Sequence, residues 1–448
     1  MPNRSQPEQQ EPVHDRSLAA GSASPVPRRD FLATGAASAA LPWLAAVAAT
    51  SPNAVAAQPA ADAAVGHSII GGYGPWAAGL AADPPRLSFR RSEYRDLEAW
   101  QEQARAKAAE LIASPASDPA PEPEVTDRRR FDGLEIEELT WQLSYGPPTK
   151  AVVLKPAGAN GRLPAVLGLH DHGGSKYFGH RKITRTGPDS HPLMVSHQRQ
   201  YYEDLAWANE LARRGYVVLV HDTFPFASRR VRFAEMKPIP WGAAATADHS
   251  DVDPENPDQI AAYNAWAAAH EHVMAKSLFC AGTTWPGVVL GEDQRALDVL
   301  CRRDDVDPQR VGCAGLSVGG LRTVYLGGVD PRIRCAVCVG FMSTWNDFLL
   351  NKAYTHTWMT YVPLLPNLLE FPEILGLRVP LPTMVQNCTE DQLYTVPEMR
   401  TADRILREVY SKAGADQNYQ GRFYAGGHKF DRPMQQDAFA WFDRWLKA

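Results

Sequence analysis

Gly315-Leu316-Ser317-Val318-Gly319 stands between a Val-rich run at residues 310–314 and a segment with a helical pattern that begins near Val318. This is the G-x-S-x-G pattern placed between a strand and a helix. The glycines permit a tight, strained turn that lifts the serine hydroxyl above the edge of a sheet. The N-terminus of the following helix favours negative charge that develops beside the hydroxyl. The stretch therefore predicts Ser317 as a nucleophile.

The chain on both sides of this turn alternates between short apolar runs and helical patterns. Such alternation predicts an α/β fold with a mostly parallel central sheet flanked by helices. Two long insertions interrupt it, at about 226–288 and 342–380, and we expect them near the active-site face. The predicted strands are 165–170, 216–220, 310–314, 335–339 and 383–386, and the predicted helices are 199–213, 292–302, one from Val318 and one from about Pro433.

A serine hydroxyl becomes a useful nucleophile when a base removes its proton. In this strand–turn–helix context the expected chain order is Ser, then an acid, then His. His428, in a glycine-containing turn before the last helical segment, is the sole histidine after His356, so it is the candidate base. The orienting acid should follow the strand at 383–386, where Asp391 is the first choice. Glu390 beside it and the more distant Asp347 remain alternatives.

Acyl transfer also needs hydrogen-bond donors for an oxyanion. One donor should be the backbone N–H of Val318, which directly follows the nucleophile. The other should come from the loop after strand 165–170, where the sequence reads His170-Asp171-His172-Gly173-Gly174. Glycines let a backbone approach a ligand closely, so Gly173 and Gly174 are the candidates.

The N-terminal region divides into an export signal and an extension. Residues 1–57 contain paired arginines at Arg28 and Arg29, an Ala-rich apolar run and small residues near 56–58. These features predict a twin-arginine-type signal, cleaved there, and a periplasmic or extracellular protein; a retained membrane anchor is the alternative. Residues 58–130 should form a helical extension, with a helix over 92–112 capped by Ser92 and a linker at 115–128. The catalytic domain should span 131–448 and open with strands at 132–145 and 149–155.

Composition excludes several classes of protein. The 448 residues carry 46 Lys and Arg against 51 Asp and Glu, a net charge of −5, so no basic footprint for nucleic acid is present. An apolar content of 44% suffices for a buried core, and no stretch after the signal predicts a membrane span.

The six cysteines lack zinc-site spacing and are interpreted as structural thiols. The pairs His170/His172 and His270/His272 lack the i, i+4 spacing of a helical zinc motif, so we expect neither metal nor cofactor.

These motifs together resemble the α/β-hydrolase superfamily. The resemblance covers about residues 130–448 and is carried by HGG at 172–174, GLSVG at 315–319, GH at 427–428 and RRGYVV at 213–218. The runs EDQRALD at 292–298, VDPQRV at 306–311 and YVPLL at 361–365 are similar to the dienelactone-hydrolase-like and acetyl-xylan-esterase-like branch. Dienelactone hydrolases use a Cys nucleophile, however, and this chain has Ser317.

The resemblance implies a serine esterase that acts on small acyl esters, often of carbohydrates, through Ser317, His428 and Asp391. The alternatives are a prolyl-oligopeptidase-like serine peptidase and a catalytically silent binding module on the same scaffold. The mature N-terminal segment is too short for the propeller that such a peptidase usually carries. The sequence favours no particular oligomeric state.

Overall fold

The computed structural model describes residues 67–115, 119–247, 249–251 and 255–447. The predicted signal at 1–57 and the start of the extension lie outside these residues. Among the described helices, none alone is long and apolar enough to cross a membrane. Two consecutive helices, Pro257–Cys280 and Trp285–Cys301, reach that length and composition only as a pair, and they are bent by 84° at their junction.

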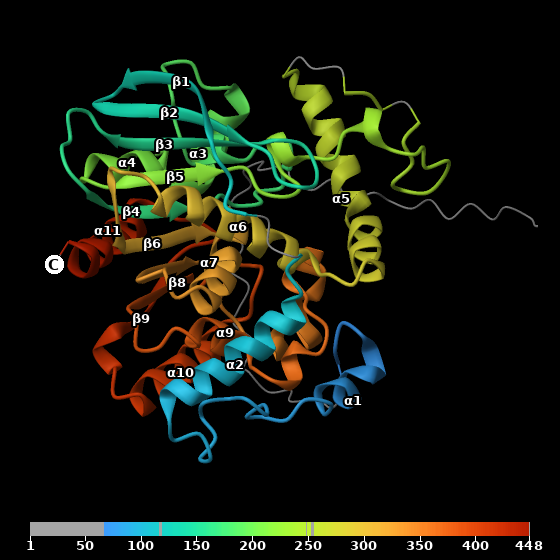
Figure 1. Ribbon diagram of the computed structural model, residues 1–448. Coiled ribbons are helices and arrows are strands. Elements are labelled where there is room, and N and C mark those ends of the chain that lie inside the picture. Colours follow the sequence, from blue (N-terminus) through green and yellow to red (C-terminus); the bar gives the residue numbers. More distant parts are fainter. Residues whose placement is uncertain (1–66, 116–118, 248, 252–254, 448) are drawn as a thin grey trace, which may run out of the picture. The chain divides into compact units, whose positions relative to one another are not determined.

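The described residues form a nine-stranded sheet in the order β1-β2-β3-β5-β4-β6-β7-β8-β9 (Figure 1). The pairs from β5 through β4 to β9 are parallel, whereas β1, β2 and β3 pair antiparallel and attach to the edge of β5. The strands are β1 Glu124–Phe131, β2 Leu134–Trp141, β3 Thr149–Pro156, β4 Leu163–Gly168, β5 Val217–His221, β6 Val306–Leu316, β7 Cys335–Val339, β8 Thr383–Cys388 and β9 Tyr419–Tyr424. The predicted mostly parallel sheet is therefore present.

Helices cover both faces of the sheet because alternate strand residues bury apolar side chains on opposite sides. Leu167 and Leu219 belong to one core cluster, together with residues of α2, α6, α7, α9 and α10, whereas Val166 and Val218 belong to another, together with residues of α3, α4 and α11. The helices are α1 Gly74–Ala78, α2 Leu97–Ile112, α3 Pro192–Tyr202, α4 Trp207–Arg213, α5 Pro257–Cys280, α6 Trp285–Cys301, α7 Val318–Val329, α8 Trp345–Asp347, α9 Phe371–Gly376, α10 Val396–Lys412 and α11 Arg432–Leu446.

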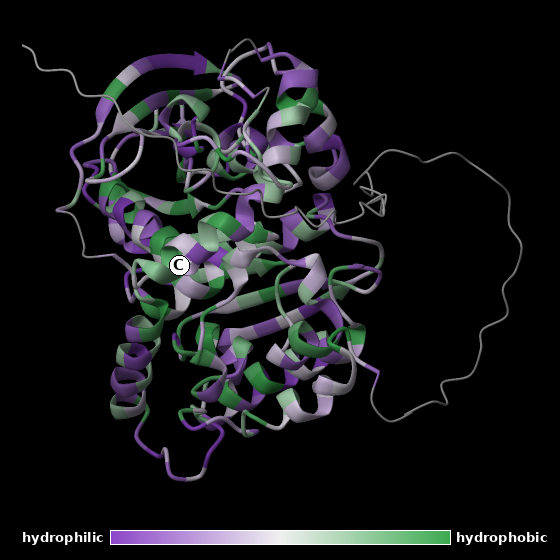
Figure 2. Ribbon diagram, turned by 90° about the vertical axis from the view of Figure 1, so that its right-hand side faces the viewer, coloured by the Kyte–Doolittle hydropathy of each residue, from purple (hydrophilic) through white to green (hydrophobic). Residues whose placement is uncertain are grey.

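Strand β1 corrects the linker predicted at 115–128, because the strand begins at Glu124 and crosses the expected domain boundary. Its residues are mostly exposed, and the colouring of Figure 2 shows that the strand is mostly hydrophilic. Cross-strand pairs of Arg128 with Glu137 and Arg129 with Glu138 join it to β2. Charged edge strands of this kind resist pairing with other chains. The strand lacks the apolar alternation of a half-buried strand, so its sequence resembles a loop.

Two helix predictions also needed correction. Helix α2 begins at Leu97 rather than near Ser92, because the Asp96 side chain accepts a hydrogen bond from the Ala99 amide and caps the helix. The single helix expected at 199–213 is two helices, α3 and α4. They are separated at Glu203, where φ is +55°, a left-handed conformation that ends a helix.

Each insertion starts beyond the carboxyl end of a parallel strand, the first after β5 and the second after β7. The first, at 226–288, contains α5, and the second, at 342–380, contains α8 and α9. Strands β4, β6, β7, β8 and β9 all end at this edge, because they pair in parallel. In open α/β sheets this is the edge at which ligands bind.

Candidate active site

Ser317 is the residue between β6 and α7, and its backbone is in an uncommon conformation. Its φ is +60° and its ψ is −123°, a combination that non-glycine residues rarely adopt. The Ser317 amide donates to the Val339 carbonyl on β7 at 2.9 Å, which fixes the turn against the neighbouring strand. The Ser317 side chain makes no helix-capping hydrogen bond. The hydroxyl is therefore not engaged in capping the helix that it starts.

The two glycines of the turn are required by close backbone contact. A Cβ on Gly315 would lie 2.3 Å from the Leu169 carbonyl oxygen, and a Cβ on Gly319 would lie 2.1 Å from the same atom. Any side chain would force the turn away from the end of β4. The G-x-S-x-G spacing thus brings the serine turn into contact with the loop that carries His172, Gly173 and Gly174.

His428 and Asp391 form a direct pair on the loops after β9 and β8. The His428 Nδ1 atom is 2.6 Å from Asp391 Oδ2, and the Asp391 side chain is 1% exposed. The other Asp391 oxygen accepts from the Leu393 amide at 3.0 Å. A carboxylate beside Nδ1 favours the tautomer with the hydrogen on Nδ1. His428 Nε2 is then an acceptor, and in the described chain it is buried and has no hydrogen-bond partner.

The other two acid candidates contact different groups. Glu390 accepts from the Gly426 amide at 3.2 Å, so it braces the histidine loop without contacting the ring. Asp347 is fully buried and accepts from the Ser343 hydroxyl at 2.7 Å and from the Thr395 amide at 3.0 Å. Of the three acids that the sequence left open, the structure brings only Asp391 to His428.

The end of β7 and the residue after it connect Ser317 to His428. Val339 accepts the Ser317 amide, and the next residue, Gly340, would place a Cβ 3.1 Å from His428 Cε1. The imidazole therefore lies against the backbone of Gly340, one residue from the atom that binds the serine turn. This chain of contacts places Ser317 and His428 on neighbouring sides of one strand end.

The candidate oxyanion donors lie on both sides of the serine turn. Val318 is the first residue of α7, whose leading amides have no partner within the helix. Gly173 has φ +49°, and a Cβ there would meet His197 Cε1 at 2.2 Å, so this position needs glycine. The Gly174 amide donates to His172 Nδ1 at 3.1 Å. The Gly174 N–H, predicted as an oxyanion donor, is therefore already bound within the loop.

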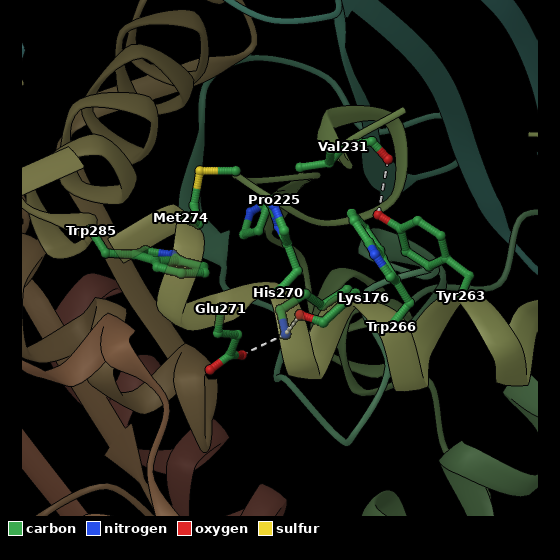
Figure 3. A pocket seen from close by; sticks show the side chains of 10 residues that line it. Lys176, Pro225, Val231, Tyr263, Trp266, His270, Glu271, Met274 and Trp285 are labelled. Carbon is green, nitrogen blue, oxygen red and sulfur yellow. Dashed lines mark hydrogen bonds and ion pairs between the residues drawn. The ribbon is translucent and has the colours of Figure 1, made fainter. Parts of the chain in front are cut away.

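A buried ion pair connects this loop to the first insertion (Figure 3), and sequence reasoning missed it. Lys176 Nζ is 2.5 Å from Glu271 Oε1 on α5, and His172 Nε2 is 3.5 Å from the same oxygen. Burial raises the pKa of Glu271, but His172 and Lys176 outweigh it and hold that pKa at about 2. Burial also lowers the pKa of Lys176, although Glu271 opposes the shift. A small pocket lined by Trp266, His270, Met274 and Trp285 adjoins the pair.

A second buried network lies under the nucleophile turn. Arg322 on α7 donates to Asp293 on α6 at 2.6 Å and to the His170 carbonyl at 3.3 Å. His221 Nε2, at the end of β5, is 3.0 Å from the same Asp293 carboxylate. The network ties α7, α6 and two strand ends together. Asp293 belongs to the run EDQRALD and His170 to the loop before Gly173, but the sequence does not show that they share a network, because their partners are far apart in the sequence.

The described residues contain no group of three or more His, Cys, Asp or Glu side chains that could hold a metal ion. All six cysteines lie in the described part of the chain and are free. Cys313, Cys335, Cys338 and Cys388 are buried. Burial raises the pKa of Cys313 to about 12, which keeps that thiol protonated and unreactive.

The strand order, the strained serine turn and the pair at the ends of β8 and β9 define an α/β-hydrolase fold, and comparison with known proteins agrees. No protein-family profile matches the chain. The chain is 26% identical over 314 residues to "Putative hydrolase YtaP" of Bacillus subtilis (strain 168), a match that covers 69% of this chain and 88% of that protein.

Solved structures with the same fold include two esterases. One is "a putative acetyl xylan esterase (BF1801)" from Bacteroides fragilis NCTC 9343, with a TM-score of 0.55 and 17% identity over 78% of this chain and 80% of that one. Another is a glucuronoyl esterase from Solibacter usitatus, with a TM-score of 0.51 and 14% identity over 77% of this chain and 91% of that one. At these identities the likeness establishes the fold.

Proposed function

We propose that this protein is a serine hydrolase of carboxylic esters, with short acyl esters of carbohydrates as its substrates. The observation that carries the proposal is the His428–Asp391 pair at 2.6 Å, with a buried, unpartnered Nε2 on the ring. A histidine that is oriented by a carboxylate and has Nε2 free to accept a proton is the arrangement that activates a serine hydroxyl, and Ser317, on the strained turn after β6, is the hydroxyl that we assign to it. The carbohydrate esterases among the fold neighbours support the choice of substrate class.

The mechanism follows from the roles of these groups. His428 Nε2 accepts the Ser317 proton while Oγ attacks the ester carbonyl, and Asp391 stabilises the imidazolium that results. The Val318 amide and one amide of the loop after β4 bind the oxyanion. The imidazolium then protonates the leaving alcohol, which departs and leaves an acyl-serine. Water, activated by His428, attacks the acyl-serine, releases the acid and restores the Ser317 hydroxyl.

Hydrolysis of nitrophenyl esters from acetyl to octanoyl by the purified protein tests this function. We expect turnover that favours acetyl, and a loss of at least about 10⁴-fold in kcat in Ser317→Ala, since the nucleophile is removed. A fluorophosphonate should label wild type but not the variant. Ser411→Ala, on the exposed end of α10, is the matched control and should keep wild-type turnover.

Three outcomes would contradict the proposal. Turnover that survives in Ser317→Ala would remove Ser317 from the chemistry. A folded wild-type protein without turnover on any ester would refute the general esterase and favour the silent binding module. Cleavage of short peptides in preference to esters would favour the peptidase alternative.

We also propose that the protein is exported through the signal at 1–57. The support is the Arg28-Arg29 pair, the apolar run and the small residues near 56–58. Cell fractionation with N-terminal sequencing tests this point. The expected result is a mature protein that starts near Gln58 and is found outside the cytoplasm. Replacing both Arg28 and Arg29 with Lys should leave the uncleaved precursor in the cytoplasm. Export of that double variant would refute the twin-arginine route.

A further inference from the structure

Lys182 is a buried cation whose hydrogen bonds, among the described residues, all go to the loop after β4, and it is not part of the proposed chemistry. Its side chain is fully buried. Its Nζ donates to the carbonyl oxygens of Asp171 at 2.8 Å, His172 at 2.7 Å and Ser175 at 2.7 Å. An ammonium group has three hydrogens to donate, so these three carbonyls satisfy it completely. The Phe226 ring lies 4.8 Å from Nζ and covers its remaining side.

The loop supplies a charge that balances the ammonium. The Asp171 carboxylate is buried, accepts from the Tyr202 hydroxyl and lies 3.1 Å from His197 Nε2. Although burial raises the pKa of Asp171, His197 and Lys182 outweigh it and hold that pKa well below its ordinary value. Burial lowers the pKa of Lys182 to about 8, although Asp171 opposes the shift. A buried charge of this kind is kept only where its partners are well placed.

Binding these carbonyls sets the direction of the loop amides. In a trans peptide the carbonyl of one residue and the N–H of the next point in opposite directions. Since the His172 carbonyl faces Lys182, the Gly173 N–H faces away from it. The Gly174 N–H is bound to His172 Nδ1, whereas no hydrogen bond within the described residues uses the Gly173 N–H. Gly173 is therefore the glycine amide of this loop that remains available to a ligand.

The same loop lies directly against the nucleophile turn. The Leu169 carbonyl is the atom that excludes side chains at Gly315 and Gly319, and Arg322 of α7 donates to the His170 carbonyl at 3.3 Å. The loop backbone thus contacts the Ser317 turn at residues 169–170 and is held by Lys182 at residues 171–175. A change at Lys182 would therefore reorient amides only a few residues along the loop from the point where the loop contacts the Ser317 turn.

We propose that Lys182 is a positioning residue that holds the His172–Gly173 peptide with its N–H directed at the oxyanion formed on the acyl carbonyl. This inference rests on the proposed function. Lys182 itself touches neither the substrate nor Ser317. It acts through the loop backbone, so its loss should weaken binding of the tetrahedral state and leave binding of the ester nearly unchanged.

The test compares Lys182→Met and Lys182→Arg with Arg378→Met in the purified full chain. Arg378 is the matched control, because it is also buried and also donates to backbone carbonyls, those of Gly327, Leu381 and Ile333. It lies before β8, at the edge of the sheet opposite the site. The readouts are kcat and KM on nitrophenyl acetate and the inhibition constant of an aryl boronic acid, which forms a tetrahedral adduct with a serine.

For folded Lys182→Met we expect a loss of about 10²-fold to 10³-fold in kcat, a KM within about threefold of wild type, and a similar loss of boronate affinity. Lys182→Arg should lose about tenfold in both quantities, because a planar guanidinium cannot direct three donors from one nitrogen. Arg378→Met should unfold more easily but keep kcat and boronate affinity per folded molecule.

If Lys182→Met does not fold, Lys182→Arg decides the matter. Wild-type kcat and boronate affinity in every folded Lys182 variant would overturn the proposal, and so would a loss of kcat without a loss of boronate affinity. These outcomes differ from failure of the proposed function. In that case wild type itself would lack ester turnover, or Ser317→Ala would retain it.

Discussion

The two sides of the site are held in different ways. Ser317, Asp391 and His428 stand on turns that follow β6, β8 and β9. The Ser317 amide binds Val339 at the end of β7, and the Asp391 amide binds Cys388 at the end of β8. The loop at 169–176 is instead held by charged side chains from outside the strands. Lys176 binds Glu271, which lies 95 residues further along the chain, and Lys182 binds three carbonyls of the loop.

The difference shows which parts of a site depend on local turn chemistry and which depend on packing. A turn with small residues takes much the same shape wherever a parallel strand meets a helix. A loop whose amides must point in one direction needs partners from outside the loop. Here these partners are Lys182, on the 3₁₀ turn His180–Lys182, which binds the loop carbonyls, and Glu271 of α5, which binds Lys176. We therefore expect changes on the first side to remove chemistry and changes on the second side to weaken it by degrees.

Asp391→Asn is the sharpest test of the first side, and we expect kcat to fall by about 10⁴-fold. The amide would donate to His428 Nδ1 and favour the tautomer with the hydrogen on Nε2, which cannot accept the serine proton. Glu390→Gln is the matched control, since it keeps an oxygen for the Gly426 amide and leaves the ring untouched. Ester kinetics on both variants check the prediction. Equal losses would mean that the local charge, and not the contact with the ring, supports the histidine.

The sequence signals for the first side are local, so they named single candidate residues for two of its three positions. G-x-S-x-G fixed the position of Ser317, and the expected chain order selected His428. The acid stayed open among Asp391, Glu390 and Asp347, because residues 390 and 391 differ only in which way a loop turns. That direction depends on the Leu393 and Gly426 amides, which no spacing rule identifies.

The second side and the sheet edge were harder to predict for one common physical reason. Lys182, Glu271 and Asp171 are charged residues that the fold buries against other segments, where they meet loop carbonyls, Lys176 and His197 in turn, and a single sequence cannot show which groups will meet. Strand β1 is the opposite case, a polar segment that becomes a strand because its arginines pair with β2. In both places, charges matched between distant segments outweigh the local pattern.

Gly173→Ala tests whether the amide direction matters as much as the triad. The new Cβ would meet His197 at 2.2 Å and would force a positive φ on alanine, so the His172–Gly173 peptide must turn. We expect kcat per folded molecule to fall by about 10²-fold, the usual effect of losing one oxyanion donor, with KM little changed. Gly187→Ala, where a Cβ would meet nothing, should behave as wild type. Wild-type kcat in folded Gly173→Ala would assign the second donor elsewhere.

The smallest effect concerns the attachment of α5, and it should depend on pH. Glu271 keeps its charge down to a pKa of about 2 in the folded protein, against 4.5 for the ordinary group. The stability contributed by this carboxylate is complete above about pH 4.5 and is lost as the pH falls towards 2. Glu271→Gln should therefore lower the free energy of unfolding by about 1–3 kcal/mol at pH 7, and by progressively less below pH 4.5.

Denaturant unfolding at pH 7, 5, 4 and 3 measures this change beside Glu255→Gln. Glu255 pairs with Arg181 at the surface, where solvent screens the charges, and its loss should cost less than about 1 kcal/mol at every pH. A Glu271→Gln effect that does not shrink below pH 4.5 would mean that the side chain acts through packing. If kcat nevertheless fell as far as in Gly173→Ala, the α5 contact would rank with Lys182 in holding the loop, and the two sides of the site would differ less than the structure indicates.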